Sequence, residues 1–385
     1  MRKKNVWIVF LAAGLSLFAI DALADWSVAK RLTWTSGDSK DPSVAIDSNN
    51  HIHIVWWDET PGISEIYYKR SIDGGTTWGA VKRLTWTSGW SYYPTIAIDS
   101  SDHIHVVWED YAPGNAEIYH KKSTDGGTTW SANKRLTWTS DNSYVPVIAI
   151  DSSDTLHVVW YDETSDNSEI YYKNSTDGGT TWSTTQRLTW TSDFSYDPVM
   201  AIDSSDTLHV VWEDYLPGND QLYYRRSADG GSTWSTAKRI TWTSSECWWP
   251  ALAIDANDHI HTIWTDYTSG GVYDIYYKRS TNGGTTWSAA QRLSWTSGAS
   301  NEPAIATDIN SHIHVAWYDD TPGNNEIYYK KSTNGGLTWS TTQRLTWTSD
   351  WSEGPAMAID SSNTIHVVWN DSTPGNYEIY YKKGS

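Results

Sequence analysis

The chain has 385 residues, a formal net charge of −18 and a single cysteine, Cys247. An acidic chain without clusters of lysine and arginine lacks the phosphate-binding surface of nucleic-acid-binding proteins, so we expect no nucleic-acid partner. One cysteine excludes an intrachain disulfide, and the fold must therefore be held together by its core.

The first 24 residues have the three parts of a secretory signal peptide. A basic start at positions 2–4 precedes an apolar run at 6–20, and Ala-Leu-Ala at 22–24 is a small-x-small cleavage site. The apolar run is too short for a lasting membrane span, and no later run is long enough for one. We predict cleavage near Ala24 and a secreted, periplasmic or cell-surface protein without membrane insertion.

From residue 31 onward the sequence repeats one hexapeptide, Arg-Leu-Thr-Trp-Thr-Ser, seven times with small changes. Successive copies are 52 residues apart, except for one interval of 53. The copies begin at Arg31, Arg83, Arg135, Arg187, Arg239, Arg292 and Arg344. A fixed period of this size is typical of a repeat architecture in which each copy is one structural unit.

Each repeat has four short runs of β-forming residues, as the second copy illustrates. Residues 95–99 are apolar, 103–108 contain β-branched residues in alternation, 117–122 form a third run and 130–139 a fourth. Ser-Ser-Asp, Pro-Gly and Asp-Gly-Gly turn signals separate these runs, and no helical period occurs. The sequence therefore predicts an all-β chain in which residues 25–385 form a single seven-bladed β-propeller of four-stranded blades.

The two ends of the chain indicate how the ring closes. The seventh repeat stops at Ser385, before its fourth strand. Trp26 precedes the first hexapeptide by the same five residues that separate Trp78 from the second. We therefore expect the N-terminal strand to join the last blade, which removes an open sheet edge.

Tryptophan is unusually frequent, with 27 in the chain, and three of its positions recur in every repeat. These positions lie in the hexapeptide, at the end of the second strand and just before the fourth strand. We interpret the 21 tryptophans at these positions as packing residues between blades. Beyond residue 24, five other tryptophans remain, at Trp57, Trp90, Trp248, Trp249 and Trp351.

Six of the seven repeats contain the sequence Ser-x-Asp/Asn-Gly-Gly-x-Thr-Trp, for example at 71–78 and 123–130. Asp-Gly and Asn-Gly suit a tight hairpin turn, whose residues need positive φ. The motif resembles the Asp-box, or BNR repeat, of the sialidase-like β-propellers. This resemblance implies that the box is structural, and that it lies between the third and fourth strands on the face opposite the ligand site.

The arginines argue against sialidase chemistry, which in that family uses three convergent arginines, a Tyr–Glu nucleophile pair and an acidic Asp. Of the 12 arginines, one lies in the first 24 residues and seven begin the hexapeptides. The remaining four end third strands and run towards the Asp-box face: Arg70, Arg225, Arg226 and Arg279. None is left for a carboxylate clamp, and the Arg-Ile-Pro signature of the family is absent.

Two connections in each repeat vary, whereas the residues around them are nearly constant. One follows the hexapeptide and ends before a proline, and the other follows the tryptophan of the second strand. In an up-and-down blade both lie on one face, where aromatic rings can stack on sugars and carboxylates can bind hydroxyl groups. The candidate ligand-binding residues are Trp57, Trp90, Tyr92, Tyr93, Tyr144, Phe194, Tyr196, Asp197, Glu246, Trp248, Trp249, Glu302, Trp351 and Glu353.

A histidine also recurs once in each second strand. The seven are His53, His105, His157, His209, His261, His314 and His366. One histidine per blade does not bring neighbours within the ~2.1 Å ligand distance of zinc, so we interpret them as partners of polar groups between blades. We interpret Asp47 and its equivalents as turn caps. The sequence shows no metal triad, phosphate loop or nucleophile elbow, and we predict no metal and no cofactor.

These observations favour a secreted, monomeric, non-enzymatic binding protein whose variable face recognises carbohydrate or another extracellular ligand, including protein. One alternative is a glycan-active enzyme, such as a sialidase-like glycoside hydrolase, with two carboxylates among Asp197, Glu246, Glu302 and Glu353. A glycosidase needs such a pair about 5–10 Å apart. Another alternative is a cell-envelope scaffold for protein interactions. Neutral drift would also vary exposed loops, but it would not favour Trp and Tyr on one face alone.

Overall fold

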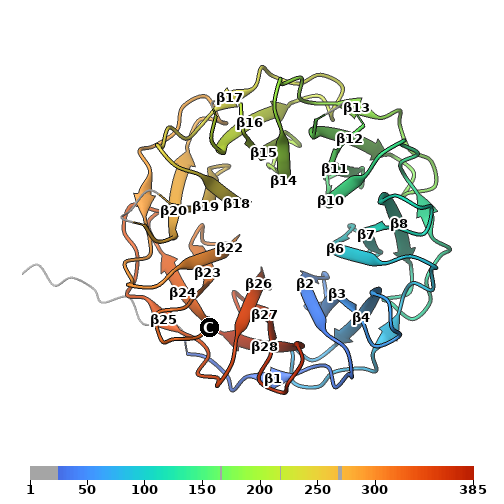
Figure 1. Ribbon diagram of the computed structural model, residues 1–385, viewed down its shortest axis with the longest axis horizontal. Coiled ribbons are helices and arrows are strands. Elements are labelled where there is room, and N and C mark those ends of the chain that lie inside the picture. Colours follow the sequence, from blue (N-terminus) through green and yellow to red (C-terminus); the bar gives the residue numbers. More distant parts are fainter. Residues whose placement is uncertain (1–24, 165–166, 217, 268–270) are drawn as a thin grey trace, which may run out of the picture.

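The computed structural model describes residues 25–164, 167–216, 218–267 and 271–385, which form seven four-stranded antiparallel sheets arranged as a ring (Figure 1). The predicted signal peptide lies outside the described residues. No helix in the described part of the chain is long and apolar enough to cross a membrane. The prediction of an all-β, seven-bladed propeller is confirmed.

The strands of each blade follow one another from the centre of the ring to its rim. The inner strands are β2 (Ser39–Ile46), β6 (Ser91–Ile98), β10 (Ser143–Ile150), β14 (Ser195–Ile202), β18 (Cys247–Ile254), β22 (Ser300–Thr307) and β26 (Ser352–Ile359). The second strands are β3 (Ile52–Asp58), β7 (Ile104–Asp110), β11 (Leu156–Asp162), β15 (Leu208–Asp214), β19 (Ile260–Asp266), β23 (Ile313–Asp319) and β27 (Ile365–Asp371). We number the blades 1 to 7 in this order.

The outer half of each blade consists of one long strand and one very short strand. The third strands are β4 (Glu65–Ser71), β8 (Glu117–Ser123), β12 (Glu169–Ser175), β16 (Gln221–Ser227), β20 (Asp274–Ser280), β24 (Glu326–Ser332) and β28 (Glu378–Gly384). The outer strands are β5 (Lys82–Arg83), β9 (Lys134–Arg135), β13 (Gln186–Arg187), β17 (Lys238–Arg239), β21 (Gln291–Arg292), β25 (Gln343–Arg344) and, in blade 7, β1 (Lys30–Arg31).

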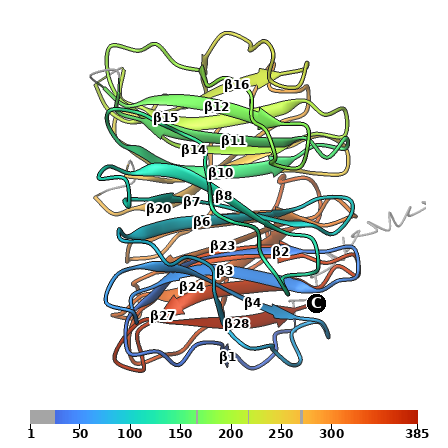
Figure 2. The ribbon, with the colours of Figure 1, turned by 90° about the vertical axis from the view of Figure 1, so that its right-hand side faces the viewer.

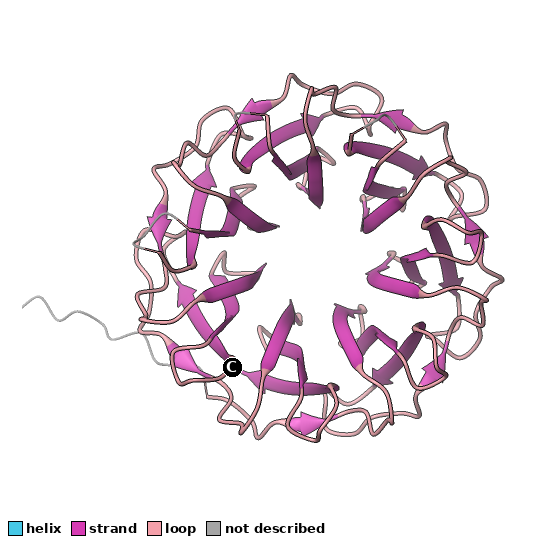
Figure 3. Cartoon of the chain, viewed as in Figure 1, coloured by secondary structure: helices cyan, strands magenta, loops and turns pink. Residues whose placement is uncertain are grey.

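The N-terminal segment completes blade 7, as expected. β1 pairs antiparallel with β28 as the outer strand of the last blade, next to the C-terminus (Figure 3). Trp26 forms a bridge with Gly384. The Ser27 amide donates to the Lys383 carbonyl at 2.8 Å. The first and last residues of the fold therefore lie in the same sheet, and the closed ring leaves no blade without its outer strand.

The hydrophobic core lies between neighbouring blades. One cluster joins Val55 and Ile66 of blade 1 to Val106 and Trp108 of blade 2, all buried. The tryptophan that precedes each fourth strand also packs across a blade boundary, since Trp78 lies edge-on against Tyr381 with ring centroids 5.0 Å apart. Two of the three recurring tryptophan positions therefore have the predicted packing role.

The interpretation of the hexapeptide tryptophans as packing residues is wrong. These seven side chains, which we call the rim tryptophans, are 66–74% exposed: Trp34, Trp86, Trp138, Trp190, Trp242, Trp295 and Trp347. Leu32 and Thr33 are buried directly after the two-residue outer strand, whereas Trp34, the next residue, is exposed, so strand alternation does not hold here. Each ring packs against cationic side chains; the Arg31 guanidinium and the Lys69 ammonium both lie 5.6 Å from the Trp34 ring centroid.

The Asp-box is a structural turn at the junction between blades. The Asp73 carboxylate accepts hydrogen bonds from the Thr77 amide at 2.7 Å and its hydroxyl at 2.6 Å, which lower the pKa of Asp73 to about 2. Gly74 and Gly75 have φ of 61° and 78°, as this turn requires. Arg70 donates to the carbonyl of Gly126 in the next Asp-box, and Arg226 and Arg279 make the equivalent contacts, so these three arginines hold neighbouring turns. Arg225 donates to the Leu188 carbonyl instead.

The two variable connections meet on the face opposite the Asp-boxes. The Glu59 amide donates to the Asp38 carbonyl at 3.0 Å, and the Tyr111 amide donates to the Trp90 carbonyl at 2.9 Å. In the side view the strands run between two faces that carry the connecting loops (Figure 2). The predicted separation of a constant and a variable face is therefore present.

Candidate functional site

A cavity of about 840 Å³ lies where the inner strands of all seven blades converge. One residue from each blade lines it at the same position, directly before a proline. We call these seven residues the bulge ring: Asp41, Tyr93, Val145, Asp197, Trp249, Glu302 and Gly354. The scaffold is nearly identical from blade to blade, so the chemistry of this cavity depends on which side chain each blade contributes.

The bulge ring has an unusual backbone. The pairing register of every inner strand shifts at this point, for example between Tyr92 and Thr95 in β6. The six non-glycine members have φ between 43° and 51°, in the left-handed region. Such a conformation costs of order 1–3 kcal/mol per residue and is most unfavourable for β-branched side chains such as Val145. The bulge turns each of these side chains away from the strand alternation and towards the cavity.

Two glutamates in second strands hold the bulge of the following blade. Glu109 Oε2 accepts a hydrogen bond from the Val145 amide at 2.9 Å, and Glu213 Oε1 accepts one from the Trp249 amide at 2.5 Å. Glu109 is 1% exposed and Glu213 is 4% exposed. These carboxyl groups are therefore buried, and each fixes the backbone of a cavity residue in the neighbouring blade.

Burial raises the pKa of two carboxyl groups in the cavity wall to about 8. For Glu109, desolvation and repulsion from Asp41 and Asp197 outweigh the hydrogen bond from Val145. For Glu302, desolvation and repulsion from Asp41 outweigh a backbone hydrogen bond. Because both groups are largely protonated at neutral pH, each can donate a hydrogen bond as well as accept one.

Asp197 and Glu213 form an interacting acidic pair. Burial and repulsion from Asp220 raise the pKa of Asp197 to about 6. The pKa of Glu213 is raised well above its ordinary value by burial and then by the charge of Asp197. Since the charge of one group disfavours ionisation of the other, the pair holds one carboxylate and one carboxylic acid over a range of pH.

Aromatic side chains occupy the wall of the cavity between these acids. Tyr93 is 46% exposed and Trp249 is 38% exposed, and both belong to the bulge ring. Tyr144 and Tyr161 also line the cavity, with ring centroids 5.2 Å apart. Burial and nearby carboxylates raise the pKa of Tyr93, so its phenol stays a neutral hydrogen-bond donor. The wall thus combines flat apolar surfaces with neutral and ionised polar groups.

The residues that line the cavity in the described chain include no arginine, lysine or histidine. Among the described inner strands, β2 alone carries a lysine or arginine, Lys40, whose ammonium lies 3.6 Å from Asp38 and 3.9 Å from the ring centroid of Tyr377. A ligand with carboxylate or phosphate groups would therefore meet like charge without a partner. The arrangement suits a neutral or cationic ligand that carries hydroxyl groups.

The structure places the fourteen sequence-predicted ligand residues in three positions. The cavity wall contains Tyr93, Tyr144, Asp197, Trp249 and Glu302. Loops outside the wall carry the exposed Trp90, Phe194 and Trp351 and the half-buried Glu246. Buried or half-buried positions behind the wall are occupied by Trp57, Tyr92, Tyr196, Trp248 and Glu353.

Three residues behind the wall have fixed hydrogen-bond partners, and one of these partners, Asp41, lines the cavity. Trp57 is 8% exposed, and its indole N–H donates to Asp41 Oδ2 at 2.6 Å. Trp248 donates to Asp220 Oδ2 at 2.7 Å. Glu353 accepts a hydrogen bond from the Tyr377 hydroxyl at 2.9 Å. Their geometry favours a positioning role over direct stacking on a ligand.

Four acidic or aromatic residues of the wall are not among the sequence-predicted ligand residues: Asp41, Glu109, Tyr111 and Tyr161. Glu109 and Tyr161 occupy the position directly after the tryptophan of the second strand. The sequence does distinguish this position, because the residue after the tryptophan varies from blade to blade within an otherwise constant strand. A side chain next to a fully buried tryptophan points to the other face of the sheet, which here faces the next inner strand.

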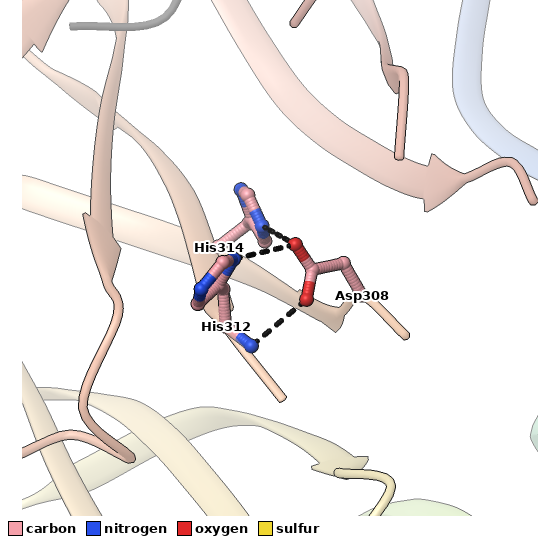
Figure 4. A group of neighbouring side chains, drawn as sticks. All are labelled: Asp308, His312 and His314. Carbon is pink, nitrogen blue, oxygen red and sulfur yellow. Dashed lines mark hydrogen bonds and ion pairs between the residues drawn. The ribbon is translucent and has the colours of Figure 1, made fainter. Parts of the chain in front are cut away.

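The expectation that the recurring histidines satisfy polar groups between blades is wrong, because their partners lie within their own blades. His53 Nδ1 lies 2.7 Å from the Tyr68 hydroxyl, and its Nε2 lies 3.3 Å from Asp47 Oδ2. The prediction of no metal site considered one histidine from each blade. Within blade 6, however, Asp308, His312 and His314 bring three potential ligand atoms within 4.8 Å of one another (Figure 4).

Comparison with known families gives two matches. The model of the BNR repeat-like domain matches residues 114–315, and that of a BNR repeat-containing family member matches residues 21–198. None of the curated proteins that were compared matches the chain.

Many solved structures share the fold at low sequence identity. An ulvan lyase of polysaccharide lyase family PL25 has a TM-score of 0.64 and 12% identity over 91% of this chain and 95% of its own. The GH93 α-L-arabinofuranosidase of Fusarium graminearum, in complex with arabinobiose, has a TM-score of 0.57 and 15% identity over 76% and 92%. The NanB sialidase of Streptococcus pneumoniae has a TM-score of 0.52 and 14% identity over 91% and 70%.

Proposed function

The chain belongs to the BNR repeat-like family, and from this premise we propose that it is an extracellular carbohydrate-binding protein whose site is the cavity. The observation that carries the proposal is the bulge ring. Six blades hold a non-glycine residue in the left-handed region, although glycine would adopt it without strain. Strained backbone of this kind concentrates at functional sites, where the orientation of a side chain is retained at a cost in the stability of the protein.

The side chains of the cavity match the chemistry of a neutral sugar. Trp249 and Tyr93 offer flat, partly exposed rings for the apolar faces of pyranose or furanose rings. Protonated Glu109 and Glu302, with ionised Asp197, offer hydrogen-bond donors and acceptors for hydroxyl groups. The volume of about 840 Å³ falls within the ~300–1,000 Å³ of ordinary small-molecule sites.

Two further observations support a glycan over other extracellular ligands. Structural neighbours carry names that refer to glycans, including ulvan and arabinobiose. The predicted signal peptide would deliver the protein to the cell exterior, where polysaccharides occur. A protein partner would need a large exposed apolar patch, whereas Tyr93, Tyr144 and Trp249 of this face line a concave cavity.

The interacting pair Asp197 and Glu213 favours a second candidate function, a glycan-active enzyme. Glycoside hydrolysis needs one carboxylic acid that protonates the leaving oxygen and one carboxylate that acts as nucleophile or base. The raised pKa of Glu213 beside the lower pKa of Asp197 provides these two protonation states. Glu213 lies beneath Trp249 rather than on the wall, and this position favours binding over catalysis.

A glycan array followed by a product assay on the same glycans tests the proposal. We expect the protein without its first 24 residues to bind a neutral glycan and to release no new reducing ends. Release of product that Asp197→Asn abolishes would establish the enzymatic alternative instead. Failure to bind any neutral glycan, or binding that Trp249→Ala and Glu302→Gln leave unchanged, would overturn the cavity as the site.

A further inference from the structure

A second cluster of polar side chains lies on the face opposite the cavity and plays no part in the proposed function. In each blade an aspartate ends the inner strand, and a histidine follows six residues later in the second strand. The position four residues after the aspartate differs between blades. It is histidine in blades 1, 2, 5 and 6, at His51, His103, His259 and His312. It is threonine in blades 3, 4 and 7, at Thr155, Thr207 and Thr364.

Blade 6 brings the three side chains of this motif together (Figure 4). Asp308 Oδ2 lies 2.8 Å from His312 Nδ1 and 3.5 Å from His314 Nε2. In the described chain, this is the group whose three potential ligand atoms all lie within 4.8 Å of one another. A carboxylate oxygen and two imidazole nitrogens from one turn therefore converge on a common point.

The surroundings hold each of these side chains in its orientation. Asp308 Oδ1 accepts hydrogen bonds from the amides of Asn310 and His312, both at 2.9 Å, which leaves Oδ2 free to face the histidines. His314 Nδ1 lies 2.7 Å from the Tyr329 hydroxyl, so its Nε2 faces Asp308. Outer hydrogen bonds of this kind orient the ligands in metal sites of proteins.

One ring nitrogen of the cluster is buried without a hydrogen-bond partner. His314 is 4% exposed, and its Nε2 is such an orphaned atom, as is Nε2 of the equivalent His261 in blade 5. In the three blades with threonine, the inner histidine lies 3.1–3.2 Å from its aspartate. In the four blades with a second histidine this distance is 3.3–3.5 Å. The second histidine thus competes for the carboxylate. In blades 5 and 6 the buried nitrogen is left without a hydrogen bond, whereas His53 and His105 keep theirs at 3.3 and 3.4 Å.

We propose that Asp308, His312 and His314 bind a divalent transition-metal ion of the zinc class. Two imidazole nitrogens and one carboxylate oxygen are donors that zinc accepts, whereas calcium and magnesium prefer oxygen ligands alone. An ion between the three atoms would satisfy the orphaned nitrogen of His314. The His312 side chain is 30% exposed, so a fourth position is open to water. The ion would join the end of β22 to the start of β23.

Zinc titration of the full mature protein without an affinity tag tests this site. After treatment with a chelator, we expect the wild type to retain one tight equivalent of Zn²⁺ through dialysis, measured by elemental analysis and calorimetry. His312→Thr introduces the residue that three blades carry naturally, so the variant should fold and should bind this equivalent at least tenfold more weakly, as loss of a ligand requires. Ca²⁺ should show no comparable binding.

The same chain provides a matched control for this experiment. His103→Thr makes the same substitution in blade 2, where the side chain is 35% exposed, and should leave the tight equivalent intact. Thermal melting in the absence of metal checks that both variants fold. The assignment would be overturned if the wild type retains no zinc, if His312→Thr retains it with unchanged affinity, or if His103→Thr loses it.

Discussion

The two faces of this propeller are built from the same repeat, yet one is nearly constant and the other is diversified. On the constant face each Asp-box contacts the preceding blade, and a Cβ at Gly127 would overlap the Tyr68 ring. A substitution in one blade is therefore opposed by its neighbour. On the diversified face the side chains of the bulge ring project into a cavity and have few obligatory partners. The comparison teaches that contacts between repeats, rather than exposure alone, determine which positions can change.

The largest expected effect is a loss of stability on substitution of an Asp-box glycine on the constant face. Gly127→Ala places a Cβ at φ 80° and against the Tyr68 ring, so it should lower the free energy of unfolding by about 3 kcal/mol or more. Chemical denaturation would measure the change. The matched control is Gly126→Ala, whose Cβ would meet only the end of the Arg70 side chain. Equal, small effects at the two glycines would contradict the role given to contacts between blades.

The next effect concerns binding at the bulge ring. Trp249→Ala should weaken binding of an array-identified glycan by about 2 kcal/mol, or roughly 30-fold, because a partly exposed stacking ring is lost. Its melting temperature should change little. Trp138→Ala, which removes a rim tryptophan that is 68% exposed, serves as the control and should bind as the wild type does. Titration calorimetry measures the affinity of both variants. A larger loss of affinity in Trp138→Ala than in Trp249→Ala would show that the rim binds the ligand.

The third effect is a dependence of stability on pH that originates in the cavity wall. Because the pKa of Glu109 is raised to about 8, the folded state holds a proton that the unfolded state releases above about 4.3. The contribution of this carboxyl to the free energy of unfolding is therefore fully present at low pH. It is lost as pH rises to about 8, by up to about 1.4 kcal/mol per pH unit. Glu109→Gln keeps the acceptor for the Val145 amide and should flatten this decline.

Denaturation curves from pH 5 to pH 9 would measure this slope. Glu302, Asp197 and Glu213 contribute in the same direction, so Glu109→Gln should reduce the decline and not remove it. An unchanged slope in Glu109→Gln would mean that this carboxyl is ionised in the folded state throughout the range.

The smallest effect should be a gain in stability. Val145→Gly replaces a β-branched residue at φ 46° with the residue type that blade 7 already has at this position, Gly354. Relief of strain should exceed the entropic cost of glycine and raise the free energy of unfolding by about 0.5–1 kcal/mol. Thermal melting would detect the increase. A loss of stability would show that the bulge holds its residues without strain.

The fold could be predicted from the sequence because the repeat period, the turn residues and the incomplete last repeat are all visible there. Six Asp-box motifs and the incomplete seventh repeat were sufficient to place the N-terminal strand in blade 7. The rim tryptophans were misinterpreted because identity across repeats does not distinguish a buried contact from a repeated surface. Only the backbone shows that Leu32 points inward and Trp34 outward.

The site could be predicted only in part, because a bulge breaks the alternation on which such predictions depend. Trp248 and Trp249 are adjacent in sequence, but the positive φ of Trp249 turns it into the cavity while Trp248 donates to Asp220. Glu109 was overlooked because it lies inside a constant strand and reaches a cavity that the next blade completes. Contacts that cross from one repeat to the next do not follow from the pattern of a single repeat.

A structure of the protein in complex with an array-identified glycan tests the central claim most directly. The account predicts that the sugar lies in the cavity, with a ring stacked on Trp249 or Tyr93 and hydroxyl groups bonded to Asp197 and Glu302. A glycan bound at Trp34 and the other rim tryptophans, or on the Asp-box face, would contradict it.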